Sequence, residues 1–328
     1  MKEQTLSRLD LFVANSQLMK SKFIWQPTLI KRLASLLYAA EDKAIDIDAI
    51  QESYELIKKN TGVFSSLRGS SAISISALLS LSEEKNEQLS NTLAIYDMMK
   101  EVNFRASDFL VVAAYQIAAH TLPENYSHTV NRAKAFYVGM KAEHRFITGQ
   151  NDYIYAAMLG MSSLDINYGL TRIEQLYATF KPHFHSGDSV QALAQVLVLG
   201  EENRELEARV LSMRGAFRER NVKLDHVHTL STLGVLSLLP AEIDSIVNGV
   251  LEVNEYLRTK KGFGIWSVTK QELSMYSATL IAYEYMSDMK IGLLTSTLST
   301  SLTNIIIAQQ AAIAAAVATS AAVNTSSN

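Results

Sequence analysis

Residues 109–141, FLVVAAYQIAAHTLPENYSHTVNRAKAFYVGMK, contain the pattern that decides the fold. The stretch Phe109–Ala119 is almost entirely apolar, which is typical of a helix that is buried on all sides. In the second half, Ala133, Phe136 and Met140 recur at offsets of three and four, so they share one helical face. Lys141 follows in the last turn, where a cation complements the helix dipole. The stretch therefore predicts a hairpin made of an apolar helix, a short turn and an amphipathic helix.

The amphipathic half of this pattern recurs six times along the chain. If the terminal basic residue is position 0, an apolar or small residue stands at −8, usually an apolar one at −5, and an apolar one at −1. The basic residues are Lys58, Lys100, Lys141, Lys181, Arg218 and Arg258, and the steps between them are 42, 41, 40, 37 and 40 residues. Further apolar helices are expected at Ala72–Leu81, Tyr153–Met161, Val190–Leu199 and Thr229–Leu239. One such hairpin cannot bury its apolar face alone, so neighbouring hairpins are expected to stack.

The sequence thus predicts an all-α fold of tandem helical hairpins, with repeats of about 40 residues stacked as an α-solenoid. A closed α/α toroid is the alternative, because periodicity does not separate an open stack from a closed ring. We expect an N-terminal capping helix at 1–24, six hairpin repeats at 25–264, and an atypical terminal unit at 265–328 with an uncharged tail rich in Ala, Ser and Thr. Only 14 Gly and 4 Pro among 328 residues argue against an all-β fold, which needs many turn residues.

Composition limits the partners and the compartment. Lys and Arg number 30 against 33 Asp and Glu, so no basic excess supports nucleic-acid binding. The absence of Cys excludes disulfides and thiolate metal sites. The N-terminus carries charges where a secretory signal needs an apolar run, so a cytoplasmic protein is expected. The uncharged stretch Ile305–Val323 is interpreted as a terminal helix that covers a core face, with a membrane anchor as the alternative.

Several of these features together resemble a known family. They are the length, the helical hairpins, the FSSLRG segment (Phe64–Gly69) before a Leu-rich helix, and the Ala-rich C-terminal tail. In these respects the chain is similar to an uncharacterised bacterial family, domain of unknown function 4003. The resemblance covers nearly the whole chain and implies a bacterial protein. It supplies no activity, substrate or catalytic residue.

Position −4 carries the candidate binding residues. It is tyrosine in the first four copies, at Tyr54, Tyr96, Tyr137 and Tyr177. If the amphipathic helices line a concave surface, these phenols face a groove and offer contact area with a polar tip to a protein partner. The alternative is a seam between adjacent amphipathic helices. With no recognised catalytic motif in the chain, the sequence favours a helical-repeat scaffold or regulatory protein-binding module over an enzyme.

Histidine and aspartate residues give an alternative function. The candidate metal ligands fall in loops between an amphipathic helix and the next apolar helix, and they are His183, His185, Asp188, His226 and His228. Imidazole with carboxylate suits Zn, Mn or Fe. Asp152 and Asp188 lie one repeat apart and could act as paired carboxylates. The alternative is therefore a metal-dependent or carboxylate hydrolase on a closed helical ring. Exposed loop histidines and helix-capping aspartates explain the same residues, so no cofactor is expected.

Overall fold

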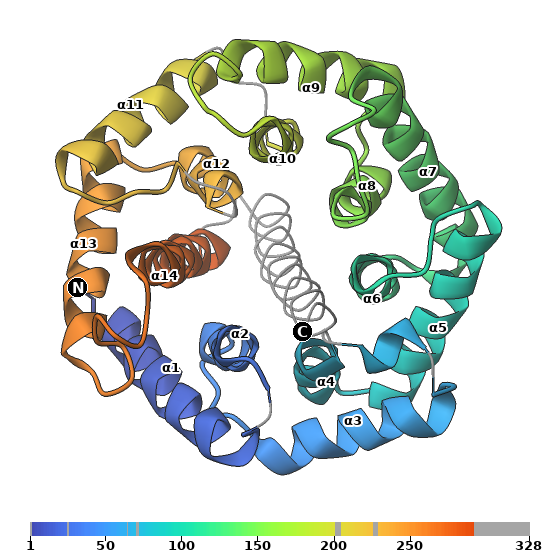
Figure 1. The fold of residues 1–328 in the computed structure, drawn as a ribbon, viewed down its shortest axis with the longest axis horizontal. Coiled ribbons are helices and arrows are strands. Elements are labelled where there is room, and N and C mark those ends of the chain that lie inside the picture. Colours follow the sequence, from blue (N-terminus) through green and yellow to red (C-terminus); the bar gives the residue numbers. More distant parts are fainter. Residues whose placement is uncertain are drawn as a thin grey trace, which may run out of the picture. The chain divides into compact units, whose positions relative to one another are not determined.

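The chain is described by a computed structural model that covers residues 2–24, 26–63, 65–69, 72–200, 205–225 and 229–291, with side chains to residue 286. In these ranges it contains fourteen α-helices, two short 3-10 helices and no strand (Figure 1). The expectation of an all-α fold is therefore confirmed. The uncharged stretch Ile305–Val323 and most of the predicted terminal unit lie outside the described residues.

The predicted helices are present with small changes at their ends. The amphipathic helices are α3 (Ile47–Asn60), α5 (Lys85–Glu101), α7 (Tyr126–Glu143), α9 (Ile166–Phe180), α11 (Leu206–Glu219) and α13 (Ile243–Thr259). The apolar helices are α2 (Thr28–Ala40), α4 (Ala72–Leu81), α6 (Asp108–His120), α8 (Asp152–Met161), α10 (Gly187–Leu197) and α12 (Leu230–Leu238). The chain begins with α1 (Glu3–Lys22), its last described helix is α14 (Lys270–Ile291), and the 3-10 helices are η1 (Ser66–Arg68) and η2 (Pro123–Asn125).

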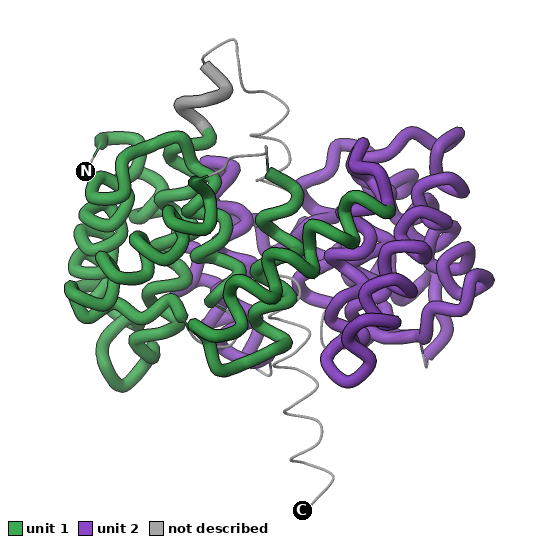
Figure 2. The backbone as a smooth tube through the Cα atoms, turned by 90° about the horizontal axis from the view of Figure 1, so that it is seen from above, with its two compact units in different colours: residues 1–14, 167–306 green, residues 15–166, 307–328 purple. Residues whose placement is uncertain are grey.

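The chain divides into two compact units, drawn in different colours in Figure 2. Unit 1 comprises residues 1–14 and 167–306, and unit 2 comprises residues 15–166 and 307–328. Helix α1 thus contributes its first part to unit 1 and its last part to unit 2. This division follows contacts in space, whereas the predicted capping helix, repeats and terminal unit follow the sequence pattern and stay a prediction.

Unit 2 packs as successive hairpins. Each amphipathic helix contacts the apolar helix that follows it, in the pairs α3–α4, α5–α6 and α7–α8. Like helices also contact each other, in the pairs α2–α4, α6–α8, α3–α5 and α5–α7. The amphipathic helices therefore form one layer of the unit and the apolar helices a second layer (Figure 1).

Unit 1 repeats this packing and joins the two ends of the described chain. Helix α13 contacts α14 and α11, and α12 contacts α10, α11 and α14. The first part of α1 packs on α14 and on the loop before it. The ring of Phe12 lies 5.2 Å from that of Phe263 and 5.4 Å from that of Tyr276, both edge to face. Arg8 Nη1 donates to the carbonyl of Tyr283 at 3.3 Å. The predicted N-terminal helix therefore completes the core of unit 1.

Burial follows the repeat pattern closely. The residues at −8, −5 and −1 are at most 1% exposed in all six amphipathic helices. They are Ile50, Ser53 and Ile57; Thr92, Ile95 and Met99; Ala133, Phe136 and Met140; Ile173, Leu176 and Phe180; Val210, Met213 and Phe217; and Val250, Val253 and Leu257. These positions form one stripe, and the apolar helices are buried nearly all round, as the run Phe109–Ala118 of α6 shows.

The helix N-caps differ from those the sequence suggests. Asp108 and Asp188 are plausible caps, but they lie inside the first turns of α6 and α10. The side chain of Ser107 accepts from Leu110 N, and that of Ser186 accepts from Ser189 N. The serine hydroxyl before each aspartate accepts a hydrogen bond from a free N–H of the first turn. The aspartate carboxylate, inside the first turn, is attracted by the positive N-terminal end of the helix dipole.

An arginine on two of the amphipathic helices binds the end of the next apolar helix. Arg132 of α7 donates to the carbonyls of Gly160, Ser162 and Leu164. Arg209 of α11 donates to Ser237, Leu239 and Ala241. The acceptors lie 28, 30 and 32 residues after the arginine in both cases. The last carbonyls of an α-helix have no partner within the helix, so the guanidinium satisfies groups that would otherwise need water.

Helix α8 approaches α7 closely at Gly160. A Cβ atom at this position would lie 2.8 Å from both the Ala133 nitrogen and the Thr129 oxygen, which are backbone atoms of α7. Only glycine fits such a contact without moving a helix. This approach brings the end of α8 within reach of Arg132.

None of the helices in the described part of the chain combines the length and the apolar character that crossing a bilayer requires. Along α1, Leu9 and Phe12 are fully buried and Val13 is 8% exposed, whereas Leu6 is 38% exposed.

The arginine that binds helix ends gives a stability prediction. Arg209→Met keeps the side-chain length but removes three hydrogen bonds from a charged donor to main-chain carbonyls. We expect it to lower the free energy of unfolding by about 2 kcal/mol. Urea denaturation followed by circular dichroism measures the change. Arg145→Met, at an exposed loop arginine, is the control and is expected to change it by less than about 0.5 kcal/mol. Equal effects of the two substitutions would contradict the role of Arg209.

Candidate functional site: the tyrosine–lysine pairs and a cleft beside α13

The four predicted binding tyrosines lie on four successive amphipathic helices. Tyr54 is on α3, Tyr96 on α5, Tyr137 on α7 and Tyr177 on α9. Tyr96 is 8% exposed and Tyr137 is 7% exposed, whereas Tyr54 and Tyr177 are half-buried. The first three belong to unit 2 and Tyr177 to unit 1. Position −4 adjoins the buried stripe, so each ring lies at the border between core and surface.

A lysine lies over three of these rings. The distance from Nζ to the ring centroid is 4.7 Å for Lys58 and Tyr54, 5.6 Å for Lys100 and Tyr96, and 5.4 Å for Lys141 and Tyr137. An ammonium group within about 6 Å of an aromatic centroid is attracted by the negative face of the ring. The two residues are four apart, so they are neighbours on the helix surface. We call these three pairs of unit 2 the Tyr–Lys row.

Carboxylates and an apolar side chain complete the surface of the row. Lys58 Nζ donates to Glu55 at 2.8 Å, and Lys100 Nζ lies 3.7 Å from Asp97. On α7, the residue in the matching position is Val138, which is 51% exposed. The row therefore presents lysine side chains and partly covered aromatic rings on three successive amphipathic helices, next to two carboxylates and one exposed valine.

The ring of Tyr137 packs in an aromatic cluster. Its centroid lies 5.5 Å from that of Phe104 and 5.0 Å from that of Tyr153, and the latter two rings are 4.8 Å apart. Burial raises the pKa of Tyr137 and of Tyr153. Lys141 Nζ donates to the hydroxyl of Tyr137 at 3.1 Å. Most of this ring therefore packs against α8 and the segment between α5 and α6, and its hydroxyl accepts from Lys141.

The structure describes three of the five predicted metal ligands. His183 and His185 are exposed in the loop between α9 and α10, and Asp188 lies in the first turn of α10. His226 and His228 lie outside the described residues. Among the residues that the structure describes, no three His, Asp or Glu side chains are grouped closely enough to hold a metal ion. The metal site, and the absence of a cofactor, stay predictions.

Asp152 and Arg68 both have structural partners. The Asp152 carboxylate is 1% exposed and accepts from Gly149 N at 2.8 Å, so it closes the turn before α8. Arg68, beside the start of α4, donates to Thr61 Oγ1 and to the carbonyls of Lys58 and Thr61 at the end of α3. Its guanidinium therefore binds a helix C-terminus, the same task that Arg132 and Arg209 perform.

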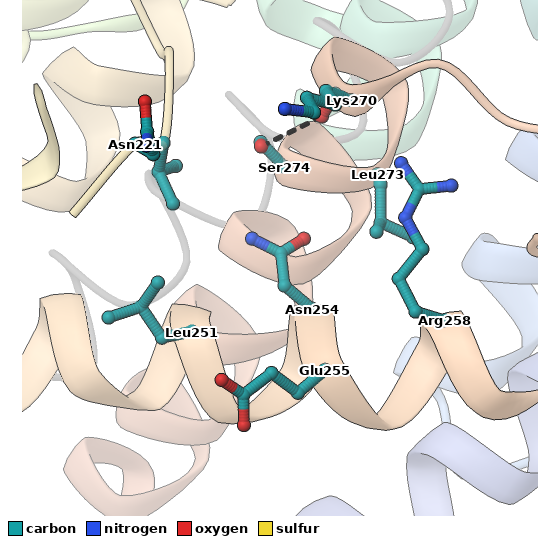
Figure 3. A pocket seen from close by; sticks show the side chains of 9 residues that line it. Asn221, Leu251, Asn254, Glu255, Arg258, Lys270, Leu273 and Ser274 are labelled. Carbon is teal, nitrogen blue, oxygen red and sulfur yellow. Dashed lines mark hydrogen bonds between the residues drawn. The ribbon is translucent and has the colours of Figure 1, made fainter. Parts of the chain in front are cut away.

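A cleft of about 360 Å³ lies in unit 1 beside α13 (Figure 3). Its lining is apolar at Val222, Leu251 and Leu273 and polar at Asn221, Asn254, Glu255, Arg258, Lys270 and Ser274. Asn254 Oδ1 accepts from Ser277 at 2.9 Å, and Arg258 Nη1 donates to the carbonyls of Phe263 and Val268. The cleft therefore borders the loop between α13 and α14. Arg258 lines the cleft and also donates hydrogen bonds to the main chain of this loop.

Comparison with known proteins identifies the family. A family model described as "Protein of unknown function (DUF4003)" matches residues 15–311. The chain belongs to this family. It is also 24% identical over 312 residues to the "Uncharacterized protein YeaA" of Bacillus subtilis (strain 168), covering 93% of this chain and 92% of that protein. No solved structure matches the chain. The resemblance inferred from the sequence is thus confirmed, and membership of DUF4003 assigns no activity.

Sequence reasoning missed two features, one in each unit. The lysines were interpreted only through the helix dipole, although the repeated spacing of Tyr and Lys by four residues already indicates neighbours on one helix face. The cleft joins residues from α13, α14 and the end of α11, which are far apart in the sequence. No local pattern could have indicated it.

The packing of Tyr137 leads to a second prediction. Tyr137→Ala removes a buried ring from the cluster with Phe104 and Tyr153, so we expect a loss of about 3 kcal/mol in the free energy of unfolding. Tyr137→Phe keeps the ring and is expected to retain most of that stability. Tyr54→Ala, at a half-buried ring, is expected to cost about 1 kcal/mol. Chemical denaturation of the three variants measures these values. Similar losses for Tyr137→Ala and Tyr54→Ala would contradict the difference in packing.

Proposed function

We propose that this DUF4003 protein is a helical-repeat scaffold or regulatory module that binds a partner protein through the Tyr–Lys row. One observation supports the proposal above others: the same Tyr and Lys side chains pair at the same register on α3, α5 and α7. The buried stripe at −8, −5 and −1 does not include these lysines. The lysine over each ring is thus a repeated feature of the surface that the core does not require.

The chemistry of the row suits contact with a protein. Long lysine side chains and partly covered rings provide contact area with several hydrogen-bond donors, and Val138 adds an exposed apolar side chain. The contact repeats from one helix to the next, so an extended segment or a helix of the partner could meet all three pairs. Stacking of the hairpins as an α-solenoid, with the closed toroid as the alternative, and a cytoplasmic location belong to this proposal.

The hydrolase alternative gains no support from the geometry of Asp152. Its carboxylate is buried and already accepts a main-chain hydrogen bond that closes a turn. A general acid or base must reach the substrate, so a capping role accounts better for this residue. We therefore propose no second function.

A binding experiment tests the proposal. The full chain is immobilised and exposed to a soluble extract of its own source, and retained proteins are identified by mass spectrometry. We expect a partner that the Lys58→Ala/Lys100→Ala/Lys141→Ala variant retains at least tenfold less than the unmodified chain. Purified partner, measured by isothermal titration calorimetry, should show the same loss.

The control variant removes the same number of lysines from other positions. Lys20→Ala/Lys22→Ala/Lys59→Ala changes three exposed lysines of unit 2 that lie outside the row, and it should bind the partner normally. Unfolding curves must show that both triple variants are folded. Equal retention of the partner by both variants, with folding intact, would remove the row from the interface.

A further inference from the structure

The loop between α13 and α14 holds two large apolar side chains in solvent. Ile265 is 81% exposed and Trp266 is 101% exposed, although Phe263, two residues before Ile265, and Val268, two residues after Trp266, are buried. We call residues 260–269 the Trp266 loop. Exposed single apolar residues are common, but an adjacent Ile and Trp at one loop tip form a site that water solvates poorly.

The base of the Trp266 loop is anchored in the core. Phe263 is 1% exposed and Val268 is 2% exposed, and the Phe263 ring packs on Phe12. Arg258 Nη1 donates to the carbonyls of both anchors, at 3.0 Å and 2.9 Å. Main-chain bonds from Ser267 and Val268 to the carbonyl of Gly264 close the tip. The two apolar side chains are therefore held outward by an ordered turn, because the anchors occupy the core positions.

Basic residues surround this tip. Residues 256–271 contain four basic side chains, Arg258, Lys260, Lys261 and Lys270, and no acidic one. Lys261 and Lys270 are exposed. Asn221 and Val222 line the same cleft as Arg258 and Lys270, and the next residue along the chain, Lys223, is also exposed. The positive charge thus continues from the loop onto the neighbouring segment of unit 1.

The acidic groups of this region are mostly engaged or set back from the tip. Asp10 lies 3.7 Å from Lys260 Nζ and accepts from the hydroxyl of Tyr256. Glu272 accepts from the main chain and the hydroxyl of Thr269 at the start of α14. Glu255 lines the cleft from α13, and Figure 3 shows its carboxylate directed away from Lys270. None of these side chains belongs to the tip itself.

We propose that the Trp266 loop docks the protein on an anionic lipid bilayer, with Ile265 and Trp266 in the interfacial layer and Lys261 and Lys270 on the headgroup phosphates. Trp is suited to the membrane–water interface, because its large ring is apolar and its N–H is polar. Lysines next to inserted apolar residues add attraction to anionic lipid. Charge complementarity and the fully exposed Trp together favour a lipid surface as the occupant. This docking is independent of the Tyr–Lys row, which belongs to unit 2.

Flotation of the full chain with lipid vesicles tests the proposal. We expect the protein to float with vesicles of phosphatidylcholine and phosphatidylglycerol and to stay behind with pure phosphatidylcholine. Ile265→Ser/Trp266→Ser should lower the partition coefficient by about tenfold or more. Lys261→Glu/Lys270→Glu should lower it at least about 20-fold, since each lysine near the surface contributes about a fivefold factor.

Matched controls change similar residues elsewhere in the described chain. Leu122→Ser removes an apolar side chain that is 63% exposed near Glu124, and it should leave binding unchanged. Lys43→Glu/Lys59→Glu changes net charge as much as the loop variant does and should also bind normally. In a Trp25→Phe background Trp266 is the only tryptophan of the chain. Its fluorescence should then shift to shorter wavelength when anionic vesicles are added.

Several results would overturn the proposal. No flotation with anionic vesicles would do so, and so would flotation that both loop variants leave unchanged, because binding would then use another part of the chain. A dimer that Trp266→Ser converts into a monomer without vesicles would show that a second copy covers the tip. Binding of poly-glutamate that the loop variants abolish, without binding to vesicles, would assign the loop to an acidic polypeptide.

Discussion

The structure depends on burying three side chains of every amphipathic helix against the neighbouring helices. A single hairpin leaves this stripe exposed to water. The side chains at −8, −5 and −1 therefore stabilise the fold only when hairpins pack on one another. All eighteen such side chains are at most 1% exposed. Position −4 follows −5 directly and lies at the border of the stripe. The partly covered tyrosines are therefore a geometric consequence of the same packing.

Helix ends impose a second constraint. Each hairpin turns the chain twice, and every turn leaves main-chain carbonyls without partners inside their helix. Three arginines from other segments donate hydrogen bonds to such carbonyls: Arg68, Arg132 and Arg209. A guanidinium can donate several bonds in a fixed plane, so one residue serves up to three carbonyls. The recurrence of the same 28-, 30- and 32-residue offsets in unit 2 and unit 1 indicates that the two units solve it with the same geometry.

Much of the helical pattern could be predicted from the sequence because it depends on local periodicity. The expected helix Ala72–Leu81 has the same bounds in α4, and each amphipathic helix contains its predicted stripe. The sequence alone does not distinguish the N-caps Ser107 and Ser186 from the aspartates that follow one or two residues later, because both residue types favour a helix start. The arginine contacts and the cleft depend on residues distant in the sequence. The exposure of Trp266 could not be predicted either, because only packing decides that Phe263 and Val268, rather than Trp266, enter the core.

Charges in the segments between the α-helices separate by segment type, and this separation has a simple cause. Segments after amphipathic helices carry Arg68, Arg105, Arg145, Lys181, Arg220, Lys223, Lys260 and Lys261 against one acid, Asp225. Segments after apolar helices carry Glu41, Asp42, Asp46, Glu83, Glu84, Glu124, Asp165, Glu201, Glu202, Glu205 and Glu242 against two bases, Lys43 and Arg204.

This arrangement places cations at the C-terminal ends of the amphipathic helices and anions at their N-terminal ends, as the helix dipole favours. The dipole effect is small and requires no apolar neighbours. It accounts for Lys260 and Lys261, but it gives no reason for Ile265 and Trp266 to stand in solvent beside them. Exposing these two side chains opposes solubility without improving the fold. The helix dipole therefore explains the basic residues of this loop, but it does not explain the exposed apolar tip. A binding role explains the tip better than the stability of the fold does.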